Sequence, residues 1–368
     1  MDKKNKKIHL VAAARPNFMK IAPLYHELRR QEWAAPEIIH TGQHYDINMS
    51  ASFFRDLALP EPTHNLEVGS GTHAEQTGMV MIAYEKVLKS YTPDLVIVVG
   101  DVNSTMAAAI ASVKLGIRTA HLEAGLRSFD RSMPEEINRV ITDSISDILW
   151  TPSIDGDENL QNEGISREKI FRVGNIMIDS FEMLRKKIED ENTLNAYDLK
   201  KGNFGLVTLH RPGNVDDSAK LAKLVDLLIT IGDSVQLIFP VHPRTRKKLE
   251  ANGLWRKLHN SENVKLTEPL NYIQFMNLAI NSRIVITDSG GIQEETTYLG
   301  IPCLTLRPNT ERPITIKEGT NQLCDLDNLQ LFVREILNGN LRNGKKPELW
   351  DGNTAKRITE SIKQIMSV

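Results

Sequence analysis

Five polar side chains stand directly after apolar runs that predict β-strands, and these residues are the best placed to do chemistry. In open α/β sheets, ligands bind at the carboxyl ends of the strands, so such positions are candidates for a site. Carboxylates held close together shift one another's pKa values, so that one can donate a proton while another accepts it. Several carboxylates with a histidine therefore suit acid–base catalysis. The five residues are Asp101, Glu123, His210, His242 and Asp288.

Some of these residues also have simpler interpretations. An aspartate after a strand often caps the next helix, and this is our interpretation of Asp288. His210 alone could be a histidine satisfied in a turn, although the Arg-Pro-Gly-Asn that follows it favours a shaped loop. Glu123 is followed by Ala-Gly, so no helix begins there for it to cap. Arg15 and Lys20 follow the first predicted strand, where they could meet an anion or could equally be exposed charges at a helix start.

Residues 283–295 predict a short strand, an abrupt turn and a helix that opens with two glycines. Such a turn leaves backbone N–H groups uncapped at the positive end of the helix, where a phosphate can bind. We expect Ser289, Gly290 and Gly291 to form this phosphate seat, because a side chain at either glycine would hold the anion away from the backbone. Glu294 or Glu295 could then reach a ribose hydroxyl. An ordinary capped turn would give the same local pattern.

Length and composition limit the class of protein. A chain of 368 residues can form two domains, and its net charge of −2 argues against a nucleic-acid binder that works by bulk charge. No apolar segment approaches a membrane span and no signal peptide precedes Ile8, so we expect a cytoplasmic protein that binds no membrane. Cys303 and Cys324 lie in apolar surroundings without a Cys-x-x-Cys spacing, which predicts buried, reduced thiols.

Cofactor signatures are missing from the sequence. The first predicted strand–helix turn has no Gly-x-Gly-x-x-Gly, and Gly-x-x-x-x-Gly-Lys-Ser/Thr does not occur. The ten histidines show no His-Glu-x-x-His or comparable spacing, and a turn with Gly42 separates His40 from His44. We therefore expect neither a dinucleotide cofactor nor a metal.

Strand and helix patterns alternate along the chain, which predicts an α/β fold with two doubly wound Rossmann-like domains. We expect an N-terminal domain over 1–174, a C-terminal domain over 175–352, and a terminal helix in 353–368 that packs back on the first domain. The first helix should begin near Phe18, Asn103-Ser104-Thr105 should cap a later one, and Pro134 should open another. The predicted strands are 8–13, 37–41, 94–100, 118–122, 147–151, 170–173, 205–209, 235–241, 263–267, 283–287 and 302–306.

The chain resembles the non-hydrolysing UDP-N-acetylglucosamine 2-epimerases. The matching motifs occur in register over essentially the whole length of the chain. The two most specific motifs are His-Leu-Glu-Ala-Gly-Leu-Arg at 121–127 and Asp-Ser-Gly-Gly-Ile-Gln-Glu-Glu at 288–295. The other matching segments are Arg15-Pro16 with Lys20, Gly100-Asp101, Pro134-Glu135-Glu136, His210-Arg211, Pro240-Val241-His242 and Glu311-Arg312-Pro313.

The resemblance implies a glycosyltransferase-B architecture, with two domains facing across a cleft that holds the active site, and we expect a homodimer. It implies reversible conversion of UDP-N-acetylglucosamine to UDP-N-acetylmannosamine, by elimination of UDP to give 2-acetamidoglucal and re-addition after protonation on the opposite face, without a cofactor. The implied catalytic residues are Asp101, Glu123, Glu135 and His210. The implied substrate-binding residues are Arg15 and Lys20, His242 near the diphosphate, Ser289, Gly290 and Gly291 as the diphosphate seat, Glu295 at the ribose, Phe275 at the uracil, and Arg312.

The chain departs from the family pattern at three places. Ala13-Ala14-Arg15-Pro16-Asn17 replaces Gly-Thr-Arg-Pro-Glu, Pro212-Gly213 replaces Arg-Glu after His210-Arg211, and Ile314 replaces Glu after Pro313. These changes leave open a modified substrate such as a UDP-diacetamido-uronic acid, and they predict a weak or absent second, regulatory substrate site. The sequence also leaves open a hydrolysing 2-epimerase and a glycosyltransferase-B sugar transferase. A non-catalytic sensor is disfavoured, because all four implied catalytic residues are present.

Overall fold

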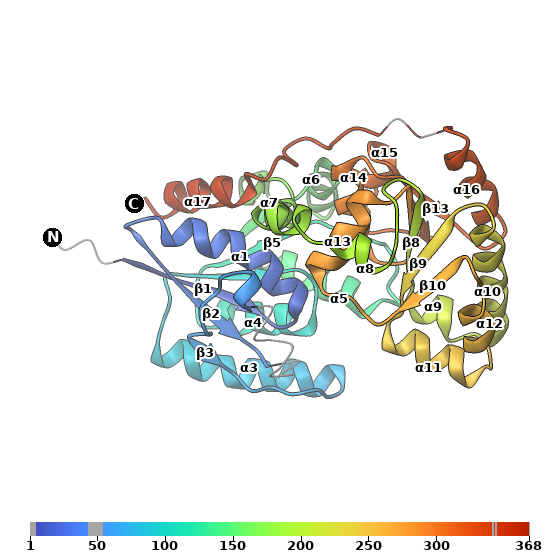
Figure 1. The fold of residues 1–368 in the computed structure, drawn as a ribbon. Coiled ribbons are helices and arrows are strands. Elements are labelled where there is room, and N and C mark those ends of the chain that lie inside the picture. Colours follow the sequence, from blue (N-terminus) through green and yellow to red (C-terminus); the bar gives the residue numbers. More distant parts are fainter. Residues whose placement is uncertain (1–4, 43–53, 341, 343, 368) are drawn as a thin grey trace. The chain divides into compact units, whose positions relative to one another are not determined.

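The computed structural model describes residues 5–42, 54–340, 342 and 344–367. The chain divides into two compact units: residues 1–183 with 348–368, and residues 184–347. Each unit contains one parallel β-sheet flanked by helices (Figure 1), so the predicted α/β class is confirmed. Helix α7 (Ile176–Glu189) contains the point where the first unit passes into the second. None of the helices in the described part of the chain has the length and apolar character needed to cross a membrane.

The first unit has a seven-stranded sheet with the order β3-β2-β1-β4-β5-β6-β7, in which every neighbouring pair is parallel. Its central strand β4 is a run of leucine, isoleucine and valine that is buried at every residue, as expected for a strand covered on both faces. The strands are β1 (Lys6–Ala12), β2 (Ala34–His40), β3 (His64–Asn65), β4 (Leu95–Val99), β5 (Thr119–Leu122), β6 (Ile148–Thr151) and β7 (Ile170–Arg172). The helices are α1 (Arg15–Arg29), α3 (His73–Ser90), α4 (Asn103–Lys114), α5 (Pro134–Ile145), α6 (Ile154–Asn162) and α17 (Thr354–Ile365), with a 3-10 turn η1 (Arg167–Lys169).

The last helix, α17, belongs to the first unit although it ends the chain. It packs against α1. Ser361 accepts a hydrogen bond from Trp150 Nε1 at 3.1 Å, and the backbone N–H of Ala355 donates to Asp179 Oδ1 at 2.8 Å. The backbone N–H groups at the start of a helix need acceptors, and Asp179 supplies one from outside α17.

The second unit has a six-stranded parallel sheet with the order β10-β9-β8-β11-β12-β13. Its strands are β8 (Phe204–Thr208), β9 (Gln236–Pro240), β10 (Val264–Thr267), β11 (Ile284–Thr287), β12 (Cys303–Leu306) and β13 (Asn321–Cys324). Its helices are α8 (Thr193–Ala196), α9 (Pro212–Val215), α10 (Ser218–Gly232), α11 (Pro243–Ala251), α12 (Trp255–His259), α13 (Tyr272–Asn281), α14 (Gly290–Leu299), α15 (Ile314–Lys317) and α16 (Leu329–Leu337).

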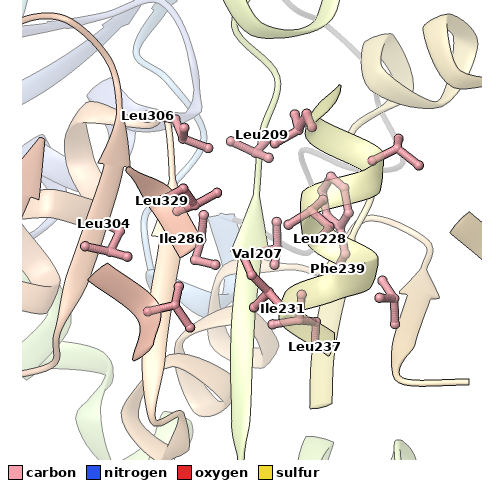
Figure 2. Close-up of a cluster of buried hydrophobic side chains, with 14 of the residues drawn as sticks. Val207, Leu209, Leu228, Ile231, Leu237, Phe239, Ile286, Leu304, Leu306 and Leu329 are labelled. Carbon is pink, nitrogen blue, oxygen red and sulfur yellow. The ribbon is translucent and has the colours of Figure 1, made fainter. Parts of the chain in front are cut away.

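One face of this second sheet is covered by a large apolar cluster (Figure 2). Leu228 and Ile231 of α10 belong to it, with Val207 of β8 and Leu237 and Phe239 of β9, and all five are almost fully buried. Burial of each such side chain contributes about 1.5–3 kcal/mol. This core packs against β8 and β11, and both strands lead into the candidate site.

Local structure differs from the sequence-based predictions in several places. Helix α1 begins at Arg15 rather than near Phe18, because Pro16 is tolerated in the first turn, where its missing N–H has no helical partner. Asn103 does not cap α4: the cap position is Val102, and the Asn103 side chain instead donates to Gln76 Oε1 of α3 at 2.9 Å. Strands β3 and β13 were not predicted, since both are short and rich in polar residues.

Both cysteines are buried free thiols, as the sequence predicted. They lie on the neighbouring strands β12 and β13. Burial raises the pKa of Cys303 to about 11, which makes it an unreactive thiol at neutral pH.

Candidate active site

Strand order identifies where each sheet can bind a ligand. In the first sheet the order reverses between β1 and β4, and in the second between β8 and β11. Ligands of open α/β sheets bind at such switch points, outside the carboxyl ends of the strands. Arg15 and Asp101 follow β1 and β4, and Glu123 follows the adjacent β5. His210 and Ser289 follow β8 and β11. The predicted site residues therefore gather at the switch point of each unit.

In the first unit, Lys20 and Glu123 form a buried ion pair between Nζ and Oε2. Both residues are more than nine-tenths buried, so Lys20 is not the exposed charge that one interpretation of the sequence allowed. Glu123 has a left-handed backbone with φ of 71°, which costs energy for any residue with a side chain. Its other oxygen, Oε1, is buried and has no hydrogen-bond partner in the described part of the chain. A strained backbone together with a buried carboxylate oxygen that lacks a hydrogen-bond partner is typical of a functional site.

Asp101 is held by Arg139, a residue that was not predicted to belong to the site. Arg139 of α5 donates from Nε to Asp101 Oδ2 at 3.0 Å, and it also pairs with Glu136. Glu136 is buried, and it accepts hydrogen bonds from Ser128 N at 2.9 Å and Phe129 N at 2.8 Å. The Glu-x-x-Arg spacing, which puts both side chains on one helix face, could have revealed this pair.

The other two predicted residues of this unit are less enclosed. Glu135, the neighbour of Glu136 in the first turn of α5, is only half-buried. Arg15 is exposed at the first position of α1. Asn17, which stands where the family pattern has glutamate, accepts from Ala14 N at 3.0 Å and donates to Val99 O at 3.0 Å. It therefore ties the turn after β1 to the end of β4.

A buried polar network supports the strand ends from behind. His121 Nδ1 lies 2.6 Å from Asp143 Oδ1, and His121 Nε2 lies 2.8 Å from Gly100 O, the residue before Asp101. Asp143 Oδ2 accepts from Gly125 N and pairs with Arg127 at 2.7 Å. Burial alone would raise the pKa of Asp143, but His121 and Arg127 hold it below its ordinary value. His121 therefore lies between a carboxylate oxygen of Asp143 and the carbonyl oxygen of Gly100, and it links helix α5 to the end of β4.

In the second unit, Asp288 does not cap α14, so that prediction is wrong. Its fully buried carboxylate turns to the loop after β8 and accepts from His210 N, Arg211 N and Asn214 Nδ2 at 2.9–3.1 Å. Asp288 Oδ1 also lies 3.2 Å from Nδ1 of His210. The sequence places the two residues 78 positions apart, and only the pairing of β8 with β11 brings them together.

His242 lies beside His210, with 5.3 Å between the ring centroids. It caps α11, since its Nδ1 accepts a hydrogen bond from Arg244 N at 3.1 Å. Partial desolvation and the neighbouring His210 lower the pKa of His242. This capping role was not predicted from the sequence.

Helix α14 begins at Gly290, and Ser289 at its cap position makes no side-chain capping bond. Within the described residues, no side chain at the cap position therefore engages the N–H groups of the first turn, and groups of this kind can bind an anion. The two glycines differ, however. A Cβ on Gly290 would lie 2.7 Å from Glu311 Oε1 and 2.8 Å from Arg312 Nη1, whereas a Cβ on Gly291 would meet nothing within 4 Å. Gly290 thus makes room for buried side chains, and only Gly291 leaves open space above the turn.

Charged side chains pack beneath this turn. Arg312 pairs with Glu311 at 2.5 Å and has Nε 3.0 Å from Glu294 Oε1, and Arg307 pairs with Glu311 at 2.8 Å. All four are buried. Burial acts to raise the pKa of Glu311, but the two arginines hold it far below its ordinary value.

Glu295 is also buried, but it is paired with a neutral group. It accepts a hydrogen bond from Tyr272 Oη at 2.6 Å. Burial, and secondarily Glu294, raises the pKa of Glu295 to about 7. Phe275 stands one helical turn beyond Tyr272 on α13 and is half-buried. The part of the chain that the structure describes brings together no three histidine, cysteine, aspartate or glutamate residues able to hold a metal ion.

Two parallel sheets with acid–base groups and an uncapped helix N-terminus at their switch points are typical of α/β enzymes that bind phosphate-bearing ligands. A solved lipopolysaccharide outer core galactosyltransferase, WaaB, shares this fold, with a TM-score of 0.54 over 98% of this chain and 99% of that chain. Its sequence identity is 16%, so the likeness concerns the fold alone.

The family model described as UDP-N-acetylglucosamine 2-epimerase matches residues 26–363, and the chain belongs to this family of isomerases. A Methanocaldococcus jannaschii UDP-N-acetylglucosamine 2-epimerase is 43% identical over 97% of this chain and 98% of its own. The crystal structure of that organism's UDP-GlcNAc 2-epimerase in complex with UDP-GlcNAc and UDP has a TM-score of 0.88, with 41% identity over 97% and 99% of the chains. A Pseudomonas aeruginosa UDP-2,3-diacetamido-2,3-dideoxy-D-glucuronate 2-epimerase is 41% identical over 86% and 88%.

Proposed function

We propose that this protein interconverts UDP-N-acetylglucosamine and UDP-N-acetylmannosamine without hydrolysing them. A carboxylate removes the proton from C2 of the sugar as the bond between C1 and the diphosphate breaks, which gives 2-acetamidoglucal and UDP. UDP then adds back to C1 while a proton is delivered to the opposite face of C2. The observation that carries this proposal is Glu123, whose strained backbone and open, buried Oε1 make it a candidate for proton transfer.

Contacts in the first unit support the roles proposed for its other polar residues. Asp101 is held by Arg139 and serves as a second proton-transfer or electrostatic group. Lys20 offsets the charge of Glu123, and Arg15 is a cation for the diphosphate. Glu135 is the third carboxylate of the set, and its partial exposure leaves it accessible to substrate.

The second unit supplies the groups proposed to hold UDP. The diphosphate binds at the N-terminus of α14, at Ser289, Gly290 and Gly291. His210 follows β8 and His242 follows β9, and the two rings lie beside each other. Glu295 meets the ribose, Phe275 contacts the uracil, and Arg312 makes a further contact. The positive charge of the buried Arg312 is compensated by the carboxylates of Glu294 and Glu311.

The unmodified N-acetyl sugar is the substrate we propose, because the similarity to the Methanocaldococcus enzyme covers more of both chains than the similarity to the diacetamido-glucuronate enzyme. The test is NMR of the purified protein with UDP-N-acetylglucosamine alone in heavy water. We expect the manno isomer to accumulate to an equilibrium with deuterium at C2 in both isomers. Free N-acetylmannosamine would identify a hydrolase instead, and product without deuterium at C2 would contradict proton abstraction by a side chain.

The same experiment with UDP-2,3-diacetamido-2,3-dideoxy-D-glucuronate tests the modified sugar as a substrate. We expect slower epimerisation of this sugar than of UDP-N-acetylglucosamine at equal concentration. A higher kcat/KM for the uronic acid would move the assignment to that substrate class.

We further propose that the protein forms a homodimer through the first unit. Met79 and Ile82 of α3, and Ile137 and Val140 of α5, are exposed apolar side chains on helices that both pack against α4. A face of this kind favours association. Light scattering should give twice the chain mass for the wild type and a smaller mass for Ile82→Glu, with Ser90→Glu at the exposed end of α3 as the matched control.

A further inference from the structure

The buried carboxylate of Asp288 contacts the loop after β8 through more than the backbone. Its Oδ2 accepts from Arg211 N at 2.9 Å and Asn214 Nδ2 at 3.1 Å, and both oxygens lie near His210 N. In addition, Oδ1 is 3.2 Å from Nδ1 of the His210 ring. A buried carboxylate needs such donors to offset its lost hydration. The ring contact goes beyond what is needed to hold the loop.

We propose that Asp288 is a positioning residue that keeps the proton of neutral His210 on Nδ1, so that Nε2 is the nitrogen available for proton transfer. The reason is chemical: an ionised carboxylate only accepts hydrogen bonds, so the ring nitrogen that faces it carries the hydrogen. In histidines generally, the partner of one nitrogen determines the state of the other. The proposal rests on the proposed function insofar as His210 acts in epimerisation.

The neighbouring histidine has the opposite arrangement. His242 Nδ1 accepts a hydrogen bond from Arg244 N, so in neutral His242 the proton is on Nε2. Two adjacent rings, with centroids 5.3 Å apart, are thus assigned opposite tautomers by the groups that face their Nδ1 atoms, a carboxylate oxygen for His210 and a backbone N–H for His242. This difference provides an internal control for a measurement of tautomer.

The position of Asp288 also affects helix α14, because this carboxylate does not cap the helix. Because Asp288 turns toward His210, no aspartate caps α14 among the described residues, and the first N–H groups of this helix can bind the proposed diphosphate. A single carboxylate therefore orients the proposed acid–base histidine and leaves the adjacent anion seat open.

The direct test is nitrogen-15 NMR of the ring nitrogens in histidine-labelled full-length protein, at a pH where the imidazoles are neutral. His210→Gln and His242→Gln assign the two sets of signals. We expect a protonated Nδ1 for His210, a protonated Nε2 for His242, and a change in Asp288→Asn that is confined to His210. A protonated Nε2 in wild-type His210 would overturn the proposal, and this spectrum decides it even if Asp288→Asn does not fold.

A kinetic test separates orientation of the ring from anchoring of the loop. Asn214→Ala removes one loop contact of Asp288 but keeps the carboxylate beside Nδ1. We expect kcat to fall about 10²-fold or more in Asp288→Asn, within the range for loss of acid–base function, and only a few-fold in Asn214→Ala. In a His210→Gln background, Asp288→Asn should cost little more, because the two residues act together.

Equal losses in Asp288→Asn and Asn214→Ala, undiminished in the His210→Gln background, would show that Asp288 only anchors the loop. If the wild type did not epimerise the sugar, the proposed function would fail. The tautomer of His210 would still test the assignment to Asp288 independently.

Discussion

Arg139 approaches Asp101 with two nitrogens of its guanidinium, Nε and Nη2, each 3.0 Å from Oδ2. The Asp101 side chain is about a third exposed, whereas that of Arg139 is nearly buried. One oxygen of Asp101 is therefore engaged from within the protein, and a forked, charge-assisted contact of this kind restricts the orientation of the other. This arrangement suits a carboxylate that acts on a substrate rather than one that only stabilises the fold.

Removing the charge of a strand-end carboxylate should reduce turnover far more than substrate affinity. We expect Asp101→Asn and Glu123→Gln each to lower kcat by about 10²–10⁴-fold, because both keep the shape of the side chain but lose its proton-transfer function. KM should stay within a few-fold of wild type. Initial rates by NMR provide the measurement, and near-full turnover in both variants would remove these two residues from the mechanism.

The Lys20–Glu123 ion pair should contribute strongly to stability only as a pair. Lys20→Met leaves a buried carboxylate without its partner, which should cost about 3–5 kcal/mol. Adding Glu123→Gln removes the unpaired charge, so the double variant should recover most of that loss. Urea unfolding of the wild type, both single variants and the double variant tests this. A double variant no more stable than Lys20→Met would indicate that the two side chains act separately.

The two glycines at the start of α14 should respond differently to substitution. Gly290→Ala should weaken UDP binding and lower stability together, because its Cβ would crowd Glu311 and Arg312. Gly291→Val should weaken UDP binding with little effect on stability, since its Cβ direction is open and only the approach of an anion is blocked. Ser289→Ala should have a smaller effect. Calorimetry with UDP, combined with thermal melts, distinguishes them, and unchanged affinity in Gly291→Val would refute the phosphate seat.

Glu295 should make the stability of the protein depend on pH between about 4.5 and 7. Its pKa is raised from 4.5 to about 7, so the folded state holds a proton that the unfolded state has already released. The contribution of Glu295 to the free energy of unfolding is therefore fully present below pH 4.5, its pKa in the unfolded state. It decreases by up to about 3 kcal/mol as the pH rises to about 7, its pKa in the folded state.

Glu295→Gln cannot ionise but can still accept from Tyr272, so it isolates this effect. The difference in unfolding free energy between the variant and the wild type should grow in favour of the variant from pH 4.5 to 7. A constant difference across this range would contradict the raised pKa.

The regulatory substrate site of the family should be weak or absent in this chain. Pro212 and Gly213, which replace an arginine and a glutamate of the family pattern, lie in the short helix α9, where they offer no charged side chain. The resemblance implies that Gln43, His44 and Arg211 also belong to this regulatory site, and of these Gln43 and His44 lie outside the described residues. Loss of charge-assisted contacts should prevent binding of a second diphosphate. Starting from UDP-N-acetylmannosamine, we expect a linear rate at once; a lag that traces of UDP-N-acetylglucosamine abolish would show that the site survives.

The sequence by itself determined most of the strands and the residues that end them. A run such as Leu95–Val99 is apolar at every position, so it fits only a strand covered on both faces, and the chain then delivers Asp101 to a strand end. Local signals were also sufficient for Pro134 at the start of α5 and for the glycine-led helix α14. Each of these local signals depends only on residues a few positions away in the sequence.

Tertiary structure decided which polar groups meet. Lys20 and Glu123 are 103 positions apart, and Asp288 and His210 are 78 apart. Asp288 was assigned to the wrong partner because a strand-end aspartate most often caps the helix that follows it, whereas its actual partners follow β8. Hydrogen bonds between distant residues depend on which strands are neighbours in the sheet, and strand order results from how whole layers of helices and strands bury their apolar surface, which no short stretch of sequence specifies.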